Sequence, residues 1–293
     1  MRTLLVVVLA ATACRTVTRD PAPPDAYAGP EARVATFNVR RLFDTVCDSR
    51  SCEPGAYEEL PTEEELDARA MQIAAAIRAL DVDVISLQEI ESQASLDVLL
   101  AHIGDAMPYG VLGEIGEVAS VDVAVLSRTP LESVAGHRAR FPFMSRELLE
   151  VHTTVDGVKV VMLAAHFKSK ANDDPSRRLY EARSSATVVN EIAEREPEAL
   201  VILGGDLNDT PGSPPLDALT LEGGLIRVAD DVSTDEQATY VYNGRKQAID
   251  HLLIAPGGAS RRIPRSVKTW RGPNGGYGGS DHFALTWNFA TYP

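Results

Sequence analysis

The sequence contains a series of short apolar runs, and each of them begins or ends with an ionisable or amide residue. The clearest run, 199–203, is followed by the segment GGDLND at 204–209. An apolar run of this length is typical of a buried strand, and two glycines allow a tight turn after it. Because α/β proteins place their chemistry at strand ends, the chain is expected to form a sheet with one polar edge.

Five other apolar runs, drawn from the whole chain, carry polar residues in the same way. These residues are Asn38, Glu89, His166, the pair Asp250–His251 and the pair Asp281–His282. Strand ends meet water, so one polar residue at such a place would be ordinary. Contact of strand ends with water does not readily explain why two Asp-His pairs and one Gln-Glu pair are attached directly to apolar runs. We therefore expect these side chains to meet in one site.

The segment after 199–203 presents Asp206 and Asn208, which are two residues apart. In extended backbone, residues with this spacing point the same way. The carboxylate can hold a proton or a cation, and the amide can donate to an anionic oxygen. The pair suits attack of water on a phosphate, although the same residues are also common in turns.

The pattern between these runs predicts helices and an antiparallel hairpin. Thr62 begins a capping box and a helix that runs to Leu80, and Ser95 is expected to cap a second helix. The pair Asp156–Gly157 separates two apolar runs, which is a strong signal of a two-residue hairpin turn. A hairpin pairs its strands antiparallel, so the sheet is not purely parallel.

Length and charge set limits on the function. The chain has 293 residues, which fits one large domain or two small ones. Its net charge is −14 and its pI is near 4.9. Tight nonspecific binding to nucleic acid relies on Lys and Arg, so this balance opposes it. It does not exclude a nuclease, because a bound divalent cation supplies positive charge locally.

The N-terminus is expected to be a targeting segment. Residues 1–13 have a positive start, a short apolar core and three small residues, the pattern of a signal peptide. Cys14 follows at once, which resembles a bacterial lipobox, in which the cysteine is lipidated; cleavage before an incidental cysteine is the alternative. Residues 14–30 are polar and read as a tether. We expect an exported, membrane-anchored lipoprotein in the periplasm or at the cell surface, or else a secreted protein.

Cys47 and Cys52 lie in a polar loop that follows Asn38 in sequence. Disulfides persist in exported proteins, so a short disulfide is expected here. Two free thiols are the alternative. Metal binding is less favoured, because no second Cys or His pair lies nearby in sequence.

Six short motifs occur in a fixed order along the chain: FNV, LQE, HFKSK, GGDLND, IDHLL and SDHFAL. Each alone is unspecific, but with the ordered set the chain resembles the endonuclease/exonuclease/phosphatase superfamily. The likeness is to bacterial secreted members related to deoxyribonuclease I and to exonuclease III-like enzymes. It runs from about Arg33 to Asn288, and we assign 31–293 to this domain. It implies a four-layer α/β sandwich, in which two packed mixed or antiparallel sheets are flanked by helices.

The resemblance implies a divalent-metal site at Glu89, with Asn38 helping to place metal and phosphate and Asp281 as a further ligand. Oxygen ligands suit Mg²⁺, with Mn²⁺ as a substitute. A salt bridge from Glu89 to an arginine is the alternative. Several relatives carry a short acidic or amide residue where this chain has Arg40, which weakens the case for another ligand there.

The resemblance also implies catalytic roles for five polar residues. Asp206 and Asn208 match the pair that orients the attacking water and holds the phosphate. His282 matches a histidine that transfers a proton or contacts the scissile phosphate, and Asp250 matches the aspartate that orients it. His166 is expected near the leaving group, with a core histidine as the alternative.

Three basic residues are candidates for contacts to phosphate oxygens. Arg146 opens one hairpin strand, Lys168 follows His166, and Arg183 lies on a predicted helix. Solvated surface charge is an equal alternative for each of them.

These residues favour in-line hydrolysis of a phosphate ester without a covalent intermediate. The first interpretation is an extracytoplasmic, metal-dependent nuclease acting on DNA, with RNA as a second candidate substrate. The alternatives are a phosphodiesterase or phosphatase for phospholipid or inositol phosphate head groups, and a non-catalytic surface lipoprotein that keeps only the fold. Expected partners are a nucleic-acid substrate and, through the N-terminal anchor, a membrane. We predict a monomer without a protein partner.

Overall fold

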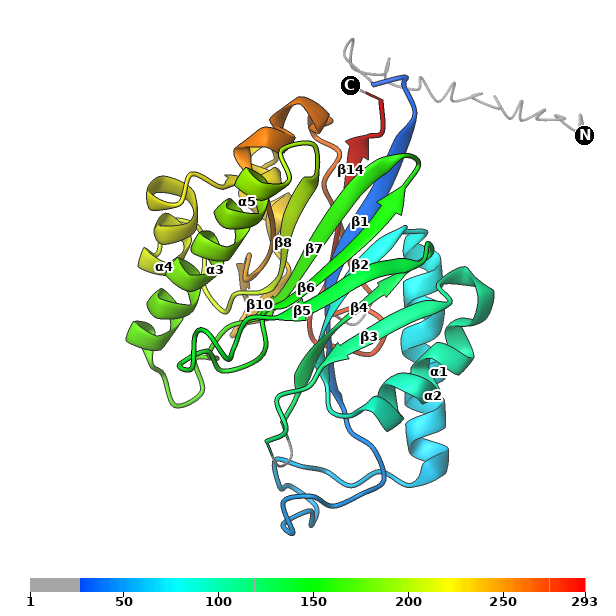
Figure 1. The fold of residues 1–293 in the computed structure, drawn as a ribbon. Coiled ribbons are helices and arrows are strands. Elements are labelled where there is room, and N and C mark those ends of the chain that lie inside the picture. Colours follow the sequence, from blue (N-terminus) through cyan, green and yellow to red (C-terminus); the bar gives the residue numbers. More distant parts are fainter. Residues whose placement is uncertain (1–26, 118–119, 274, 293) are drawn as a thin grey trace, which may run out of the picture.

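The computed structural model describes residues 27–117, 120–273 and 275–292, and Figure 1 shows their arrangement. The predicted signal peptide, the predicted lipidation site Cys14 and most of the predicted linker lie outside the described residues. Within the described part, no helix is both long enough and apolar enough to cross a membrane.

Two six-stranded sheets form the centre of the molecule. The first has the order β13-β14-β1-β2-β4-β3, with the bounds β1 (Glu31–Leu42), β2 (Val84–Ile90), β3 (Tyr109–Gly113), β4 (Asp122–Ser127), β13 (Lys268–Trp270) and β14 (Ala284–Ala290). The second has the order β5-β6-β7-β8-β12-β9, with the bounds β5 (Leu131–Gly136), β6 (Leu149–Val155), β7 (Val158–His166), β8 (Leu200–Asp206), β9 (Ile226–Arg227) and β12 (Asp250–Ile254). A separate hairpin pairs β10 (Tyr240–Tyr242) with β11 (Arg245–Gln247).

Helices cover the outer faces of the two sheets (Figure 1). The long ones are α1 (Glu63–Leu80) and α2 (Gln93–Ile103) on the first sheet, and α3 (Pro175–Arg195) on the second. The short ones are α4 (Pro214–Asp217), α5 (Thr234–Gln237), η1 (Gly104–Ala106), η2 (Ala218–Glu222), η3 (Val228–Asp231) and η4 (Pro256–Arg261). One apolar cluster fills the space between the sheets, and two others lie under the helices. This order of layers confirms the four-layer α/β sandwich.

Local sequence signals explain where several elements begin and turn. Thr62 caps α1 by accepting a hydrogen bond from the Glu65 amide, and the Glu65 side chain completes the capping box. Asp156 and Gly157 join β6 to β7 with φ values of 46° and 82°, in the left-handed region that this hairpin turn requires. Both features agree with the predictions from the sequence.

The predicted cap of α2 is wrong by three residues. Ser92, and not Ser95, is the N-cap, because the backbone is extended at Ser92, with φ −138° and ψ 167°. The Ser92 hydroxyl accepts a hydrogen bond from the Ser95 amide, and the Ser95 hydroxyl accepts one from the Ser92 amide. Ser95 therefore takes the place in the capping box that Glu or Gln usually fills.

The sheet topology brings the polar strand ends to one edge of the sandwich. In the first sheet β1 and β2 are parallel, and Asn38 lies opposite Gln88. In the second sheet β7 and β8 are parallel, which aligns His166 with Asp206. β12 runs antiparallel to β8 and aligns Asp250 with the same Asp206. Both sheets therefore deliver polar side chains to a common place.

A buried ionic cluster joins β6 to the end of α3 on the outer face of the second sheet. The Glu150 carboxylate lies 2.7 Å from His137 Nε2 and 2.6 Å from His152 Nε2, and Arg195 donates to it at 3.2 Å. Burial alone would raise the pKa of Glu150, but hydrogen bonds from both histidines lower it to about 2. The hydrogen bond to Glu150 raises the pKa of His152, and Glu196 adds to that rise.

This cluster predicts a pH-dependent contribution to stability. The lowered pKa of Glu150 stabilises the fold above pH 4.5, and this effect is lost as the pH falls toward 2. The raised pKa of His152 stabilises the fold below pH 6.5, and this effect is lost as the pH rises through the folded value. Glu150→Gln should therefore lower the free energy of unfolding most near pH 5.5, by about 1–3 kcal/mol, and less at pH 9.

Urea unfolding of Glu150→Gln and of the native protein at both pH values measures this difference. Glu194→Gln is the control for loss of a carboxylate from the surface. Glu194 is exposed on α3, next to Arg195, and has no ion pair among the described residues. Equal destabilisation by Glu150→Gln at pH 5.5 and pH 9 would contradict the role given to His152.

Candidate active site

The polar edge opens into a cavity of about 1070 Å³. Its walls come from the ends of strands in both sheets, from the loops that follow them and from the β10–β11 hairpin. Seven of the predicted catalytic, metal and phosphate residues line it together with Asp206: Glu89, Arg146, His166, Lys168, Asn208, Asp281 and His282. Strand ends that are far apart in the sequence thus line one cavity.

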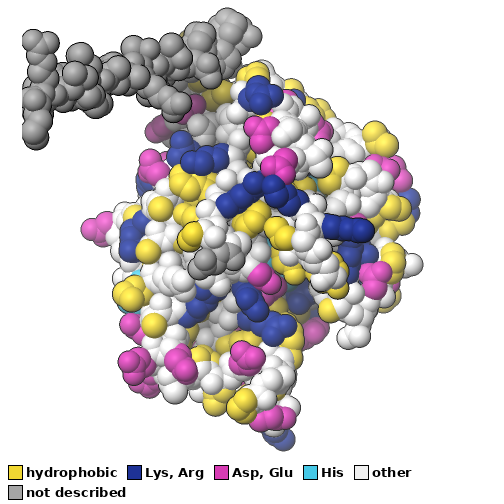
Figure 2. Space-filling view, turned by 180° about the vertical axis from the view of Figure 1, so that it is seen from behind, with side chains coloured by type: hydrophobic (Ala, Val, Ile, Leu, Met, Phe, Trp, Pro, Cys, Tyr) yellow, Lys and Arg dark blue, Asp and Glu magenta, His cyan; other side chains and the backbone are white. Residues whose placement is uncertain are grey.

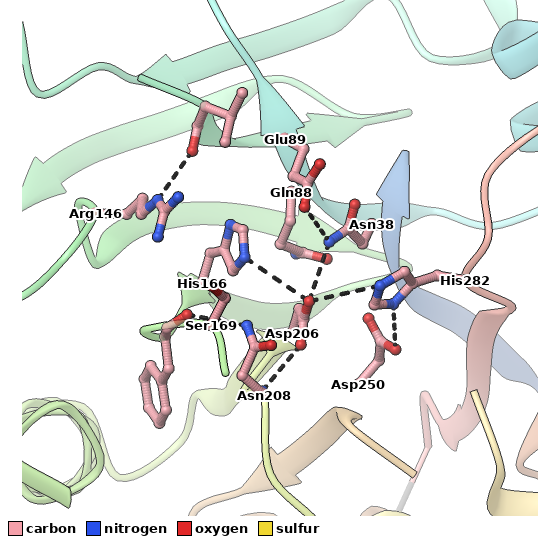
Figure 3. A network of polar contacts seen from close by, with 12 residues as sticks. Asn38, Gln88, Glu89, Arg146, His166, Ser169, Asp206, Asn208, Asp250 and His282 are labelled. Atoms are coloured by element: carbon pink, nitrogen blue, oxygen red, sulfur yellow. Dashed lines mark hydrogen bonds and ion pairs between the residues drawn. The ribbon is translucent and has the colours of Figure 1, made fainter. Parts of the chain in front are cut away.

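Asp206 lies at the centre of the polar network (Figure 3). Asn38 Nδ2 donates to Asp206 Oδ2 and to Glu89 Oε1, each at 3.0 Å, and so links the two sheets. The backbone amide of Asn208 donates to Asp206 Oδ1 at 2.9 Å. Burial is the main cause that raises the pKa of Asp206 well above its ordinary value of 3.8, and the negative charge of nearby Asp250 adds to the rise. This carboxylate therefore holds a proton more strongly than an exposed aspartate does.

His282 and Asp250 form a buried pair next to Asp206. His282 Nδ1 lies 2.9 Å from Asp250 Oδ2, and His282 Nε2 lies 3.8 Å from Asp206 Oδ2. Burial opposes the charged imidazole, but the Asp250 carboxylate outweighs it and raises the pKa of His282 well above 6.5. Asp250 is held in turn through its amide, which donates to the Thr239 hydroxyl at 3.0 Å. Asp250 therefore favours the charged form of His282 and fixes the orientation of its ring.

His166 approaches the same carboxylate from another side (Figure 3). Its Nε2 atom lies 3.8 Å from Asp206 Oδ2, and its side chain is fully buried. Burial, together with the positive charges of Arg146 and His282, lowers the pKa of His166 well below 6.5. Two histidines therefore face one carboxylate oxygen, and their surroundings shift their pKa values in opposite directions.

Asn208 and His251 differ in their position relative to the cavity: Asn208 lines it and His251 does not. Asn208 has a φ of 54° and lines the cavity, while its Nδ2 atom donates to the Phe167 carbonyl at 3.0 Å. His251 does not line the cavity: its Nε2 atom lies 2.9 Å from the Asp209 carbonyl, and burial lowers its pKa to about 4. Alternation along β12 explains this, because it turns His251 away from the face that carries Asp250.

The backbone of Glu89 adopts a left-handed conformation that is rare for residues other than glycine. Its φ is 71°, and the register of β2 shifts around it, so a bulge turns the carboxylate into the cavity. Its oxygen atoms accept hydrogen bonds from Asn38 and from the Arg41 amide at 2.9 Å. Asp281 lines the same cavity and is partly exposed, with Arg40 Nε at 3.9 Å. Glu89 and Asp281 thus give this side of the cavity carboxylate oxygens, the donors that a hard divalent cation prefers.

The three predicted phosphate contacts have different outcomes. Arg146 and Lys168 line the cavity, with Arg146 Nε donating to the Val121 carbonyl at 3.2 Å. Arg183 does not: it is exposed on α3 and pairs with Glu222 at 3.0 Å. The helical period explains the error, because the face of α3 that packs on the sheet carries other residues and leaves Arg183 in solvent.

Sequence reasoning missed several residues of the cavity wall. These are Arg41, Tyr57, Lys170, Arg177, Tyr240 and Tyr242. The Tyr240 ring centre lies 4.8 Å from that of His282. Arg41 had a usable signal, since it closely follows Asn38 at a strand end. The tyrosines come from loops and a small hairpin, where no hydrophobic period indicates direction.

The predicted disulfide is confirmed: Cys47 and Cys52 are bonded, with their Cα atoms 6.0 Å apart. The stapled loop lies beside the cavity, because Tyr57 from the same loop forms part of the wall.

Comparisons with known proteins agree with this architecture. Truncated TDP2 from Caenorhabditis elegans is 20% identical, with a TM-score of 0.63 over 89% of this chain and 98% of that one. TDP2 from D. rerio, complexed with a single strand DNA product, is 17% identical, with a TM-score of 0.63 over 89% and 99%. A Staphylococcus aureus beta toxin is 16% identical, with a TM-score of 0.61 over 89% and 100%. At these identities, the likeness shows the fold alone.

No curated protein sequence matches this chain. A family model does match: the Endonuclease/Exonuclease/phosphatase family aligns over residues 35–282, which is most of the chain. That span includes the polar ends of both sheets and finishes at His282. The chain therefore belongs to the endonuclease/exonuclease/phosphatase family and is a phosphoesterase of that family.

Proposed function

We propose that this protein is a divalent-metal-dependent phosphodiesterase, and specifically a nuclease that cleaves DNA and also accepts RNA. One observation carries the proposal. The buried Asp206 carboxylate faces an open cavity between a charged His282 and a neutral His166, and Asn38 links it to Glu89. This arrangement supplies a proton acceptor and a fixed cation at the place where a phosphate would enter.

Each residue of the network suits one part of hydrolysis. The raised pKa of Asp206 suits a group that orients water and takes its proton. The His282 cation, held by Asp250, would stabilise negative charge that develops on a phosphoryl oxygen. His166 is neutral and can donate a hydrogen bond on the other side of Asp206.

Glu89, Asn38 and Asp281 are the residues that would hold the metal. A bound divalent cation offsets charge on the phosphoryl and leaving oxygens. We propose Mg²⁺, with Mn²⁺ as a substitute, because the ligands are oxygen atoms.

The distribution of charge supports a nucleic-acid substrate. Six of the 28 lysine and arginine side chains line the cavity, although the whole chain has a net charge of −14. On the face shown in Figure 2, basic side chains lie singly or in small groups among acidic and apolar ones. Basic side chains are thus more frequent in the cavity wall than in the whole chain, although four acidic residues line it too: Glu89, Glu117, Asp206 and Asp281. Affinity for a strand would come from a few local contacts.

We also propose that the protein is exported and anchored through a lipidated Cys14. The support is the sequence pattern of 1–13, in which an apolar core and three small residues precede a cysteine. Metabolic labelling with a radioactive fatty acid tests this: Cys14→Ser should remove the label.

Hydrolysis assays test the substrate proposal. The mature protein is incubated with plasmid DNA, single-stranded DNA, RNA, and phosphatidylcholine or phosphatidylinositol vesicles, each in Mg²⁺ and in EDTA. We expect cleavage of DNA, and of RNA at a lower rate, only with Mg²⁺. Release of head groups from vesicles with DNA left intact would favour a phospholipid substrate and overturn the nuclease proposal.

A further inference from the structure

Two guanidinium groups in the cavity stand out because they lack an acidic partner. Among the described residues, neither Arg41 nor Arg146 has a carboxylate within 4.0 Å. Three other cationic side chains of the wall pair with a carboxylate: Arg40 with Asp281, Lys170 with Asp209, and Arg177 with Asp174. Lys168 and Arg146 each donate to a backbone carbonyl, of Ser169 and Val121 respectively. A pair of uncompensated arginines inside a hollow is suited to bind an anion.

Tyr57 lies beside both of these arginines. The Arg41 Cζ atom lies 4.6 Å from the centre of the Tyr57 ring, over its face. Burial raises the pKa of the Tyr57 hydroxyl, and the positive charges of Arg146 and Arg41 offset part of that rise. The three side chains thus form one group, with two guanidinium donors and a hydroxyl that line the same cavity.

The backbone places this group next to the reaction centre. Arg40 and Arg41 have φ values of 59° and 48°, in the left-handed region that non-glycine residues rarely adopt. The register of β1 shifts at this point, and the Arg41 amide donates to Glu89 Oε2 at 2.9 Å. This hydrogen bond therefore fixes the backbone of Arg41 against the proposed metal ligand Glu89.

The disulfide-stapled loop holds Tyr57 in its place. The neighbouring Glu58 is 2% exposed and accepts hydrogen bonds from the Asp48 and Ser49 amides, each at 2.7 Å. Those two residues belong to the turn closed by the Cys47–Cys52 disulfide. The disulfide-closed turn therefore holds the Glu58 side chain, and Glu58 in turn restricts the position of its neighbour Tyr57.

We propose that Arg41, Arg146 and Tyr57 form a subsite for a second phosphate group of the substrate, next to the scissile phosphodiester. The inference rests on the proposed phosphodiesterase function and adds a substrate class. Substrates with two neighbouring phosphates are favoured, as in an oligonucleotide or a phosphorylated inositol head group. A head group that is itself cationic is disfavoured, because two guanidinium groups would repel it.

Matched pairs of small substrates test the subsite. The dinucleotide d(TpT) has one phosphate, whereas d(pTpT) and d(TpTp) add a terminal phosphate on either side. Glycerophosphoinositol and its 4-phosphate form the corresponding pair for a lipid head group. The measurement is kcat/KM in Mg²⁺. We expect the native protein to prefer a substrate with the second phosphate by about 10-fold or more, since bonds to charged groups are strong.

Variants identify the residues responsible for that preference. Arg41→Gln/Arg146→Gln should abolish the preference: KM for the two-phosphate substrate should rise until its kcat/KM equals that of the one-phosphate substrate of the same pair, measured on the same variant. Arg183→Gln is the matched control, because it removes an arginine that lies outside the cavity and should keep the preference. A preference in the nucleotide pair supports a nucleic-acid phosphate, and one in the inositol pair supports a head-group phosphate.

Two outcomes separate this inference from the function on which it rests. Cleavage of d(TpT) with no preference in either pair overturns the subsite and leaves the phosphodiesterase proposal intact. Absence of hydrolysis of every phosphodiester overturns both. A preference that survives in Arg41→Gln/Arg146→Gln also overturns the assignment, whichever substrate shows it.

The loop has a test of its own. Cys47→Ser/Cys52→Ser should raise KM for the preferred two-phosphate substrate by about three- to ten-fold, because Tyr57 loses its support, and should leave kcat on d(TpT) unchanged. Circular dichroism establishes whether the variant is folded. An unchanged KM in a folded variant would show that the disulfide does not shape the subsite.

Discussion

Glu89→Gln is expected to lower turnover of any phosphodiester by about 10³-fold or more. The substitution keeps the shape of the side chain and its place beside Asn38, but it removes the charge that would attract a divalent cation. Because the left-handed backbone turns Glu89 out of the apolar core, the melting temperature should change little. Binding of Mn²⁺, followed by calorimetry or paramagnetic resonance, should weaken together with activity.

The neighbouring Glu91 offers a matched control for this result. It accepts a hydrogen bond from the Asp44 amide at 2.7 Å and does not line the cavity, so Glu91→Gln should keep metal binding. Full turnover in the presence of EDTA would be incompatible with a metal-dependent mechanism. Equal losses of metal binding at Glu89 and Glu91 would place the metal elsewhere.

The second large effect concerns the Asp250–His282 pair. Asp250→Asn, His282→Ala and the double variant should each lose about 10²–10⁴-fold in kcat. The losses should not multiply, because Asp250 acts by holding the charged His282 ring, and a second change removes a contribution that is already gone. Turnover of the three variants on one substrate at saturating Mg²⁺ completes the cycle.

His251 tests the placement of β12. Its side chain is buried and bonded to the Asp209 carbonyl, so His251→Ala should lower stability while turnover per folded molecule falls much less. Multiplicative losses at Asp250 and His282 would show that they act independently. A loss of turnover at His251 as large as that at His282 would mean that the ring takes part in the reaction.

The sequence was most informative where a polar residue directly follows an apolar run. Asn38, His166 and Asp206 could be named because hydrophobic runs mark strands. His166 and Asp206 are the last residues of β7 and β8, and Asn38 lies where the pairing of β1 with β2 becomes irregular. The Asp156–Gly157 turn and the Thr62 cap were equally local signals, which few alternative conformations satisfy. In each case the relevant physics acts within a few residues.

Contacts between distant segments could not be derived in this way. The hydrogen bond from Asn38 to Asp206 joins residues 168 positions apart in different sheets, and the packing of those sheets came from the family resemblance. Arg183 was misplaced because a helix must be rotated correctly against its sheet before its free face is known. Tyr57 depends on a loop held by Glu58 and a disulfide, for which no periodic pattern exists.

The pairing of the first and last major strands has a consequence for the biosynthesis of this protein. β1 pairs directly with β14, and the Ser280 hydroxyl donates to the Asn38 carbonyl, 242 residues earlier in the chain. Asn38 and His282 therefore come from opposite ends of the family domain, which spans residues 35–282. A ribosome-bound chain has no complete reaction centre until the segment that carries Ser280 and His282 has been made and has left the ribosome. For a phosphodiester hydrolase that we propose is exported, this order of assembly keeps the unfinished polypeptide harmless to the nucleic acids of the cell that makes it.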